Sequence, residues 1–226
     1  MTPSAPNSTA PPPDASPDAL AARLDCPASM RPHILKVLQG EYDIPNLHLP
    51  GTSPVILDIG ANVGAFALWA LHRWPLARIT CYEPHPDNFA LLQKNLPRGP
   101  TLVPVAVWHS HGQMFLHDGL FNCGEASLVD VGGSAPSGQL VPVIAASSLP
   151  RCDILKIDTE GAELPILQSY PHLPRATAIM LEWHSPADRA AIAGILQHAG
   201  FTCIADDAET INRGVQKWVS QKTANV

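Results

Sequence analysis

Four acidic residues and one histidine stand at corresponding places in this sequence, each at the end of a short apolar run. They are Asp58, Glu83, Asp158, Glu182 and His184. Ligands of open α/β sheets bind beyond the carboxyl ends of the strands, so we expect these side chains to meet in one cleft. Buried carboxylates without partners are costly, and packing alone explains such an arrangement poorly. The pattern therefore predicts a ligand site with acid–base chemistry.

The turn after the first apolar run indicates which ligand the site holds. The dinucleotide fingerprint Gly-x-Gly-x-x-Gly leaves bare backbone around a pyrophosphate, whereas here Asn62 stands between Gly60 and Gly64 where the middle glycine would be. Asp58 would repel a pyrophosphate but suits an amino-acid ammonium group. Glu83 is placed to accept hydrogen bonds from two ribose hydroxyls. S-adenosylmethionine fits these features better than NAD; a strand–turn–helix without a ligand is the alternative.

Strands and helices alternate along most of the chain, which predicts an α/β fold with a mostly parallel sheet. The expected strands are 54–58, 78–82, 101–106, 153–157 and 177–182, with a final pair at 201–205 and 215–220. The expected helices are 64–74, 86–95, 161–169 and 186–198. Between them, 107–150 is Gly-rich and irregular, with runs at 113–117 and 140–144 that suit a hairpin.

The length of 226 residues suits one α/β domain with extensions. Residues 1–18 are rich in Pro, Ser, Ala and Thr, and we expect a disordered tail. Residues 19–50 form the expected helical extension, with short helices near 18–24 and 31–38, and 51–226 form the cofactor-binding domain.

Composition narrows the class of protein. The net charge of −6 and the pI near 5.9 disfavour a nucleic-acid partner. A membrane partner is not expected, because no run of about 18 apolar residues exists. The first residues lack a basic segment followed by an apolar core, so no secretory signal is expected. The five scattered cysteines fit a reducing, cytoplasmic setting and have no metal-binding spacing.

Four stretches together resemble the FkbM family of class I S-adenosylmethionine-dependent methyltransferases. They read LDIGANVG at 57–64, YEPHPDNF at 82–89, VAV at 105–107 and KIDTEGAE at 156–163. The resemblance covers about residues 50–205. It implies a Rossmann-like, seven-stranded, mostly parallel sheet with helices on both faces and a reversed final strand. It also implies O-methylation of a sugar or natural-product hydroxyl, so the expected partner is a small-molecule hydroxyl acceptor. A homodimer is also expected.

The matching positions supply the expected cofactor-binding residues. They are Asp58, Gly60, Ala61, Asn62, Gly64, Glu83, Pro84, Ala106, Val107 and Asp158. Asp58 and Gly60 are expected along the methionine part and Glu83 at the ribose. Ala106 and Val107 are expected by the adenine. Asp158 is placed where the methyl group faces the acceptor.

Catalysis on a hydroxyl requires removal of a proton, by a positioned side chain or with the help of a metal ion. Asp158, Glu182 and His184 are the catalytic candidates, with His184 as the favoured base; a loop histidine bonded to backbone is the alternative. Asp158 and Glu182 also suit Mg²⁺, although no residue is assigned as a dedicated metal ligand. The Asn/Asp-Pro-Pro-aromatic motif of many amine-methylating enzymes is absent.

Several neighbouring residues have two interpretations each. The buried Lys156 should pair with an acid. Glu160 and Glu163 stand at the start of a helix. There they either interact favourably with the helix dipole or take part in catalysis. His109 and His111 are expected to be solvated loop residues rather than a metal fragment. The loop 121–127 either contacts the acceptor or is a plain turn. An NAD-dependent oxidoreductase and a non-catalytic scaffold on the same fold are the competing functions.

Overall fold

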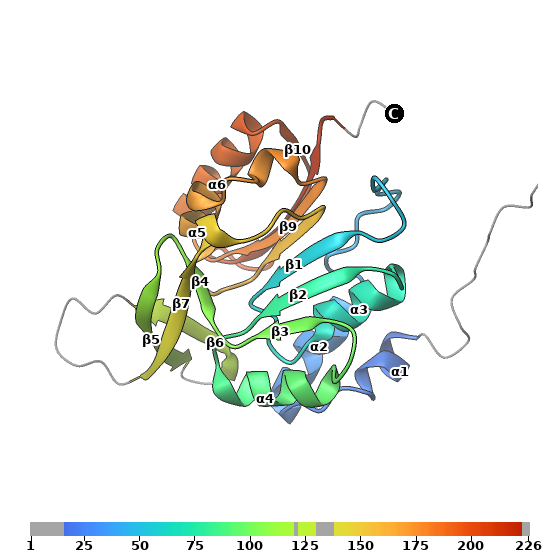
Figure 1. Ribbon diagram of the computed structural model, residues 1–226, viewed down its shortest axis with the longest axis vertical. Coiled ribbons are helices and arrows are strands. Elements are labelled where there is room, and N and C mark those ends of the chain that lie inside the picture. Colours follow the sequence, from blue (N-terminus) through green and yellow to red (C-terminus); the bar gives the residue numbers. More distant parts are fainter. Residues whose placement is uncertain (1–15, 120–121, 130–137, 223–226) are drawn as a thin grey trace, which may run out of the picture.

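The computed structural model describes residues 16–119, 122–129 and 138–222 (Figure 1). Most of the predicted N-terminal tail, residues 1–15, lies outside these ranges. Helix α1 (Pro17–Ala21) begins within the last residues of the predicted tail, because the side chain of Ser16 caps it by accepting the backbone N–H of Ala19 at 3.2 Å. Within the described ranges, no helix is both long and apolar enough to cross a membrane.

The main sheet has seven strands in the order β10-β11-β9-β8-β1-β2-β3. They are β1 (Val55–Ile59), β2 (Arg78–Tyr82), β3 (Thr101–Val103), β8 (Ile154–Ile157), β9 (Ala178–Trp183), β10 (Phe201–Ala208) and β11 (Gly214–Ser220). Neighbours from β9 to β3 pair in parallel, whereas β11 is antiparallel to both β9 and β10. The mostly parallel sheet with a reversed last strand is therefore confirmed.

Helices cover both faces of this sheet (Figure 1). Alternate residues of β1 belong to different cores, since successive side chains of a strand point to opposite faces. Ile56 packs into the core formed with α1, α2 (Arg31–Leu38), α3 (Ala65–Arg73) and α4 (Pro86–Asn95). Leu57 packs into the core formed with α5 (Glu163–Ser169) and α6 (Pro186–His198). Three short 3-10 helices span Ala28–Met30, Ala146–Ser148 and Leu173–Arg175.

A second sheet of four strands, in the order β4-β7-β5-β6, replaces the irregular span expected at 107–150. Its strands are β4 (Ala106–Trp108), β5 (Gly112–Gly119), β6 (Asn122–Val129) and β7 (Gln139–Ala145). The predicted pairing of the two runs is confirmed, because Gln113 pairs with Pro142 and Phe115 with Leu140 in antiparallel register. The two strands do not form a hairpin, because β6 lies between them in the chain. Alternating apolar residues, among them Met114, Leu116, Val141 and Val143, give this sheet its own small core.

Two predicted boundaries in this region were wrong. The single strand expected at 101–106 is divided between the two sheets, because Pro104 has no N–H to continue a ladder. The loop expected at 121–127 is largely strand β6, which pairs with β5; Phe121 lies outside the described residues.

Candidate active site

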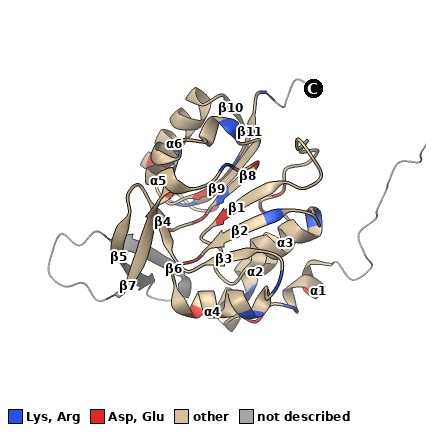
Figure 2. Cartoon of the chain, in the orientation of Figure 1, with Lys and Arg blue, Asp and Glu red and all other residues tan. Residues whose placement is uncertain are grey.

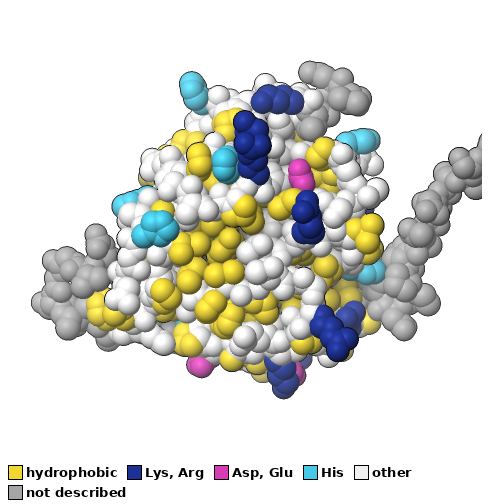
Figure 3. Space-filling model, viewed as in Figure 1, with side chains coloured by type: hydrophobic (Ala, Val, Ile, Leu, Met, Phe, Trp, Pro, Cys, Tyr) yellow, Lys and Arg dark blue, Asp and Glu magenta, His cyan; other side chains and the backbone are white. Residues whose placement is uncertain are grey.

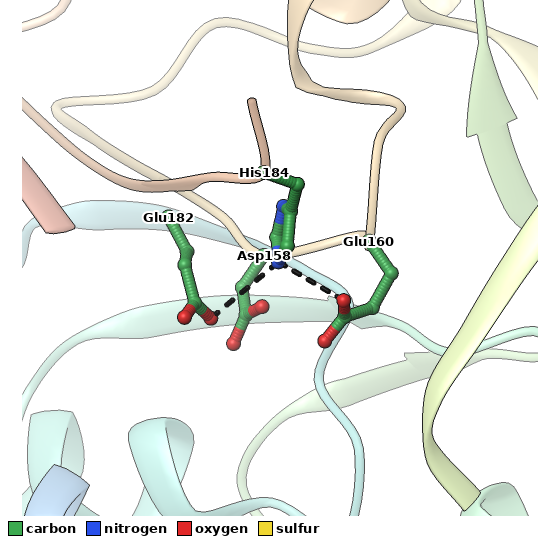
Figure 4. A group of neighbouring side chains, drawn as sticks. All are labelled: Asp158, Glu160, Glu182 and His184. Carbon is green, nitrogen blue, oxygen red and sulfur yellow. Dashed lines mark ion pairs between the residues drawn. The ribbon is translucent and has the colours of Figure 1, made fainter. Parts of the chain in front are cut away.

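Acidic residues lie at the carboxyl ends of neighbouring central strands (Figure 2). At the ends of β8 and β9, four side chains point toward one another: Asp158, Glu160, Glu182 and His184 (Figure 4). One potential ligand atom from each lies within 4.8 Å of the other three. We call these four residues the acid–histidine cluster. Of the five side chains expected to meet, Asp158, Glu182 and His184 belong to this cluster, Glu160 joins them, and Asp58 and Glu83 lie outside it.

His184 is enclosed by carboxylates. Its Nε2 lies 3.0 Å from Glu160 and 3.8 Å from Glu182, and its Nδ1 lies 3.3 Å from Glu163. Burial alone would lower the pKa of the imidazole, but Glu160 and Glu163 outweigh burial and raise it to about 11. His184 is thus an imidazolium at neutral pH. Its ring nitrogens contact the carboxylates of Glu160, Glu163 and Glu182 rather than loop backbone. To act as the predicted base, the imidazolium would first have to lose its proton.

Asp158 and Glu182 form a coupled pair of carboxyl groups. Burial opposes ionisation of Asp158, but the charge of Lys156, with help from His33 and His184, lowers its pKa to about 2. Burial and repulsion from Asp158 raise the pKa of Glu182 to about 9, although Arg213 lies 3.1 Å from its Oε1. Near neutral pH the pair therefore holds one proton, which resides on Glu182, and Asp158 carries the negative charge.

Lys156 links the cluster to the glycine turn. It lies opposite Asp58 in the β1–β8 register, and its ammonium group is 3.0 Å from Oδ1 of Asp58. It also donates a 2.6 Å hydrogen bond to the carbonyl oxygen of Gly60. Asp58 is 0% exposed and Lys156 3%, so this is a buried ion pair. The predicted acidic partner of Lys156 is confirmed. The contact of Asp58 with a cofactor ammonium stays a prediction, because its carboxylate already faces Lys156.

The turn between β1 and α3 needs its glycines for two different reasons. Gly60 has a φ of +77°, and a Cβ there would overlap the backbone oxygen of Asp158. Gly64 has a φ of +95°, and a Cβ there would come within 2.8 Å of Leu92 in α4 and of Leu96, which caps that helix. The turn therefore packs directly on the end of β8, which brings the predicted cofactor turn and the acid–histidine cluster together.

Glu83 holds the end of β2 in a defined geometry. One carboxylate oxygen accepts the backbone N–H of Asn62 at 2.7 Å and the other accepts that of His85 at 2.8 Å. Burial raises the pKa of Glu83, against the effect of these two donors. Each oxygen has further acceptor capacity, so the carboxylate remains suited to ribose hydroxyls. Half-buried Pro84 follows it along the chain.

The residues predicted near the adenine lie in the second sheet. Ala106 and Val107 belong to β4 and are buried, at 3% and 2% exposed. Val107 packs in the same core as residues of β1 and β8. The exposed His111 accepts the backbone N–H of Ala145 at 3.3 Å. In the described part of the chain, the acid–histidine cluster is the only group of side chains close enough together to hold a metal ion. His109 and His111 do not belong to it.

The N-terminal extension supplies side chains that the sequence did not predict for this site. The hydroxyl of Tyr42 donates to Oδ2 of Asp158 at 3.2 Å. A pocket lies between α2 and the glycine turn, and its lining includes His33, Tyr42, Asn62, Lys156 and Asp158. No local pattern could reveal the Tyr42 contact, because it joins residues 116 positions apart.

Ion pairs also connect the extension to the β10–β11 hairpin. Lys36 of α2 pairs with Glu209, which lies 3.2 Å from Arg213. Arg213 in turn pairs with Glu182 of the cluster. A chain of contacts between basic and acidic side chains therefore runs from the extension to the cluster.

The carboxylate of Glu163 binds the backbone of the loop before α5 and does not face the open cleft. It is 0% exposed, and its carboxylate accepts the backbone N–H of Thr159 at 2.9 Å and that of Gly161 at 3.0 Å. These bonds satisfy the backbone where Glu160 and Gly161 adopt positive φ values of 55° and 112°. The structural interpretation of Glu163 is thereby favoured over a catalytic one.

Comparisons with known proteins identify relatives of the chain. The family described as "Methyltransferase FkbM domain" matches residues 58–203. "Methyltransferase sdnD" of Sordaria araneosa is 28% identical over 210 residues, covering 74% of this chain and 80% of the relative. "Hexuronic acid methyltransferase AglP" of Haloferax volcanii is 26% identical over 175 residues, covering 73% and 71%. The solved structure of "Methyltransferase FkbM" from Methylobacillus flagellatus KT has a TM-score of 0.61 at 14% identity, covering 90% of this chain and 58% of that one.

Proposed function

The chain belongs to the FkbM methyltransferase family, and from that premise we propose that this S-adenosylmethionine-dependent methyltransferase methylates a hydroxyl of a sugar or another small acceptor. The observation that carries the proposal is the acid–histidine cluster beside the glycine turn, because a hydroxyl must lose a proton when it takes a methyl group. A relative named as a hexuronic acid methyltransferase supports a sugar-like acceptor.

Asp158 is the group proposed to receive the proton. At neutral pH it is the ionised member of the Asp158–Glu182 pair, and His184 already carries its own proton. When bound, S-adenosylmethionine would supply the methyl group to the acceptor oxygen from its sulfonium sulfur, and Asp158 would receive the hydroxyl proton. The sulfur leaves as a neutral thioether, so charge and atoms balance. His184 keeps Glu160 beside the reacting atoms.

The cofactor is proposed to lie along the turn from Gly60 to Gly64. Glu83, fixed by two backbone donors, would hold the ribose hydroxyls. Ala106 and Val107 at the start of the second sheet would lie by the adenine. The polar carbonyl and amide groups of the turn would then face the methionine part, and Lys156 and Asp58 would keep the turn in place from behind.

A divalent cation such as Mg²⁺ is a further part of the proposal. Once Glu182 and His184 have released their protons, Asp158, Glu160 and Glu182 would offer the carboxylate oxygens that Mg²⁺ prefers, and the acid–histidine cluster is compact enough to hold one ion. A bound cation would lower the pKa of a coordinated hydroxyl. Methyl-transfer assays with and without EDTA test for this cation, because full activity in excess EDTA would remove the cation from the proposal.

The test begins with binding. Calorimetry with S-adenosylmethionine and with S-adenosylhomocysteine should show saturable heat, and a parallel fluorescence titration with NADH should show none. Binding of NADH alone would favour the oxidoreductase that the shared fold allows.

Methyl transfer is then measured with radiolabelled S-adenosylmethionine and a panel of acceptors that includes hexuronic acids and neutral sugars. Products are treated with mild alkali, since methyl ethers survive it and methyl esters do not. The proposal is supported if the Asp158→Asn variant no longer forms methyl ethers while the matched control His109→Gln, at an exposed site, still does. Alkali-labile products would overturn hydroxyl methylation. Cofactor binding without turnover on any acceptor would favour a non-catalytic scaffold.

A further inference from the structure

A second pocket lies at the opposite end of the main sheet from the acid–histidine cluster. Its volume is about 600 Å³, and its lining includes Val55, Asp153 and Ala176. Val55 is the first residue of β1, Asp153 immediately precedes β8, and Ala176 lies two residues before β9. Asp158 is five residues beyond Asp153, so at a rise of about 3.3 Å per residue the two sites are roughly 16 Å apart. The pocket is therefore separate from the cofactor cleft.

Three cationic side chains line this pocket: Arg151, Arg175 and Lys222. They come from separate segments, before β8, at the end of a 3-10 helix and after β11. Lys222 is held at the pocket by a 3.3 Å hydrogen bond to the carbonyl oxygen of Pro174. Figure 3 shows several Lys and Arg side chains in the upper part of the view, on the side of the C-terminus.

Within residues 16–119, 122–129 and 138–222, no carboxylate forms an ion pair with any of these three side chains. By contrast, Arg189 and Lys94 each pair with an acid. The one acid in the lining is Asp153, and its Oδ2 already accepts the backbone N–H of Val55 at 2.8 Å. Three positive charges and one negative charge leave the pocket with an excess of +2 in a protein whose net charge is −6.

We propose that this pocket binds a small phosphorylated anion. Two guanidinium groups offer paired donors that match phosphate oxygens, and the ammonium group adds a third cation. A phosphate monoester carries close to two negative charges at neutral pH, which equals the excess in the pocket. The concave shape favours a small molecule, and the net charge of −6 disfavours a nucleic acid or an anionic membrane. S-adenosylmethionine has no phosphate, so this ligand is distinct from the cofactor.

The direct test is calorimetric titration of the full chain with inorganic phosphate in the presence of saturating S-adenosylhomocysteine, which occupies the cofactor cleft. One saturable site is expected, with affinity that falls as salt rises. In the double variant Arg151→Gln, Arg175→Gln the dissociation constant should rise at least tenfold. Lys222→Gln should raise it less, because a single point charge is lost. Acetate, a singly charged oxyanion, should bind more weakly than phosphate.

The matched control is Arg98→Gln, an exposed arginine outside the pocket that changes the net charge by one unit. It should leave phosphate binding unchanged. Absence of saturable binding, or equal weakening in Arg98→Gln, would overturn the proposal. Binding to vesicles that contain phosphatidylglycerol without binding to free phosphate would overturn it in favour of a membrane surface. Methyl transfer plays no part in these readouts, so failure here is distinguishable from failure of the proposed reaction.

Discussion

The hydroxyl of Tyr42 donates a hydrogen bond to Oδ2 of Asp158 from a segment that precedes the family-matched region. The match begins at residue 58, so the extension contributes a side chain to the site from outside it. Tyr42 is 1% exposed and packs edge-to-face on Phe66 at 5.6 Å between ring centroids. The ammonium group of Lys156 lies 5.9 Å from the tyrosine ring centroid. The extension therefore orients Asp158 from one side while Lys156 attracts it from another.

Replacement of Tyr42 by phenylalanine should lower the turnover of the proposed reaction more than the stability of the fold. The ring contact with Phe66 is kept, but Asp158 loses one donor to its ionised carboxylate. Misplacement of a reacting group by about 1 Å can cost about 100-fold in rate, so kcat should fall by roughly tenfold or more. The matched control is Tyr170→Phe, whose hydroxyl donates to the carbonyl of Pro150 away from the cluster. Equal losses of kcat in the two variants would contradict the positioning role.

The two members of the buried ion pair should differ in what their removal costs. Lys156→Met leaves both Asp58 and Asp158 without their cation, whereas Asp58→Asn leaves Lys156 with Asp158 at 3.7 Å. Loss of one member of a buried pair typically costs about 3–5 kcal/mol, and we expect Lys156→Met to reach this range and Asp58→Asn to fall below it. Urea titration of the free energy of unfolding measures both.

The control for this comparison is Lys94→Met. Lys94 pairs with Asp25 at 2.7 Å, but the two side chains are 69% and 56% exposed. Exposed pairs contribute about 0–1 kcal/mol, so this variant should change stability little. A larger loss in Asp58→Asn than in Lys156→Met would contradict the assignment of Lys156 as the shared cation.

Substitutions at two glycines with positive φ should distinguish the cost of backbone strain from the cost of steric overlap. Gly60 has a φ of +77° and an added Cβ would overlap the backbone of Asp158, whereas Gly161 has a φ of +112° and nothing within 4 Å of an added Cβ. Gly161→Ala should therefore show the cost of the backbone conformation alone, about 1–3 kcal/mol. Gly60→Ala should lose more stability and also weaken S-adenosylmethionine binding, because the turn must move away from β8. Calorimetric binding together with thermal unfolding checks both, and similar behaviour of the two variants would refute the overlap.

Local patterns were sufficient for most of the main sheet. The helix at 86–95 and the strand pair after Gly200 follow from apolar spacing, capping residues and turns close in sequence. The second sheet was largely missed, although one of its strand pairs was expected, because β5 and β7 pair across a long connection. Its small core becomes visible only once β5 and β7 lie in register.

The site was predictable in its position but not in its pairing. Acids at strand ends indicated that Asp158, Glu182 and His184 would meet, since parallel strands end at one edge. Which charge neutralises which depends on distances that the sequence does not contain. Asp58 faces Lys156, and His184 faces Glu160 and Glu163, because of packing between strands and loops.

The protonated state of the cluster predicts how stability depends on pH. His184 has a pKa of about 11 in the folded protein, against about 6.5 when unfolded, and Glu182 about 9 against about 4.3. Between pH 6.5 and 8 the folded state therefore binds more protons than the unfolded state, so the free energy of unfolding must fall as pH rises. Each group contributes up to about 1.4 kcal/mol per pH unit. Cys, Tyr and Lys have higher ordinary pKa values and contribute little in this window.

Urea titrations at pH 6.5, 7.25 and 8 measure this slope. Glu182→Gln keeps a neutral side chain of the same shape and should reduce the slope, and His184→Gln should reduce it as well. His109→Gln, which changes an exposed histidine outside the cluster, should leave it unchanged. Stability that rises with pH in this window would mean that the cluster is deprotonated in the folded state. Asp158 would then have Glu182 as a second negative charge beside it, and a cation rather than a shared proton would be needed to hold the two carboxylates together.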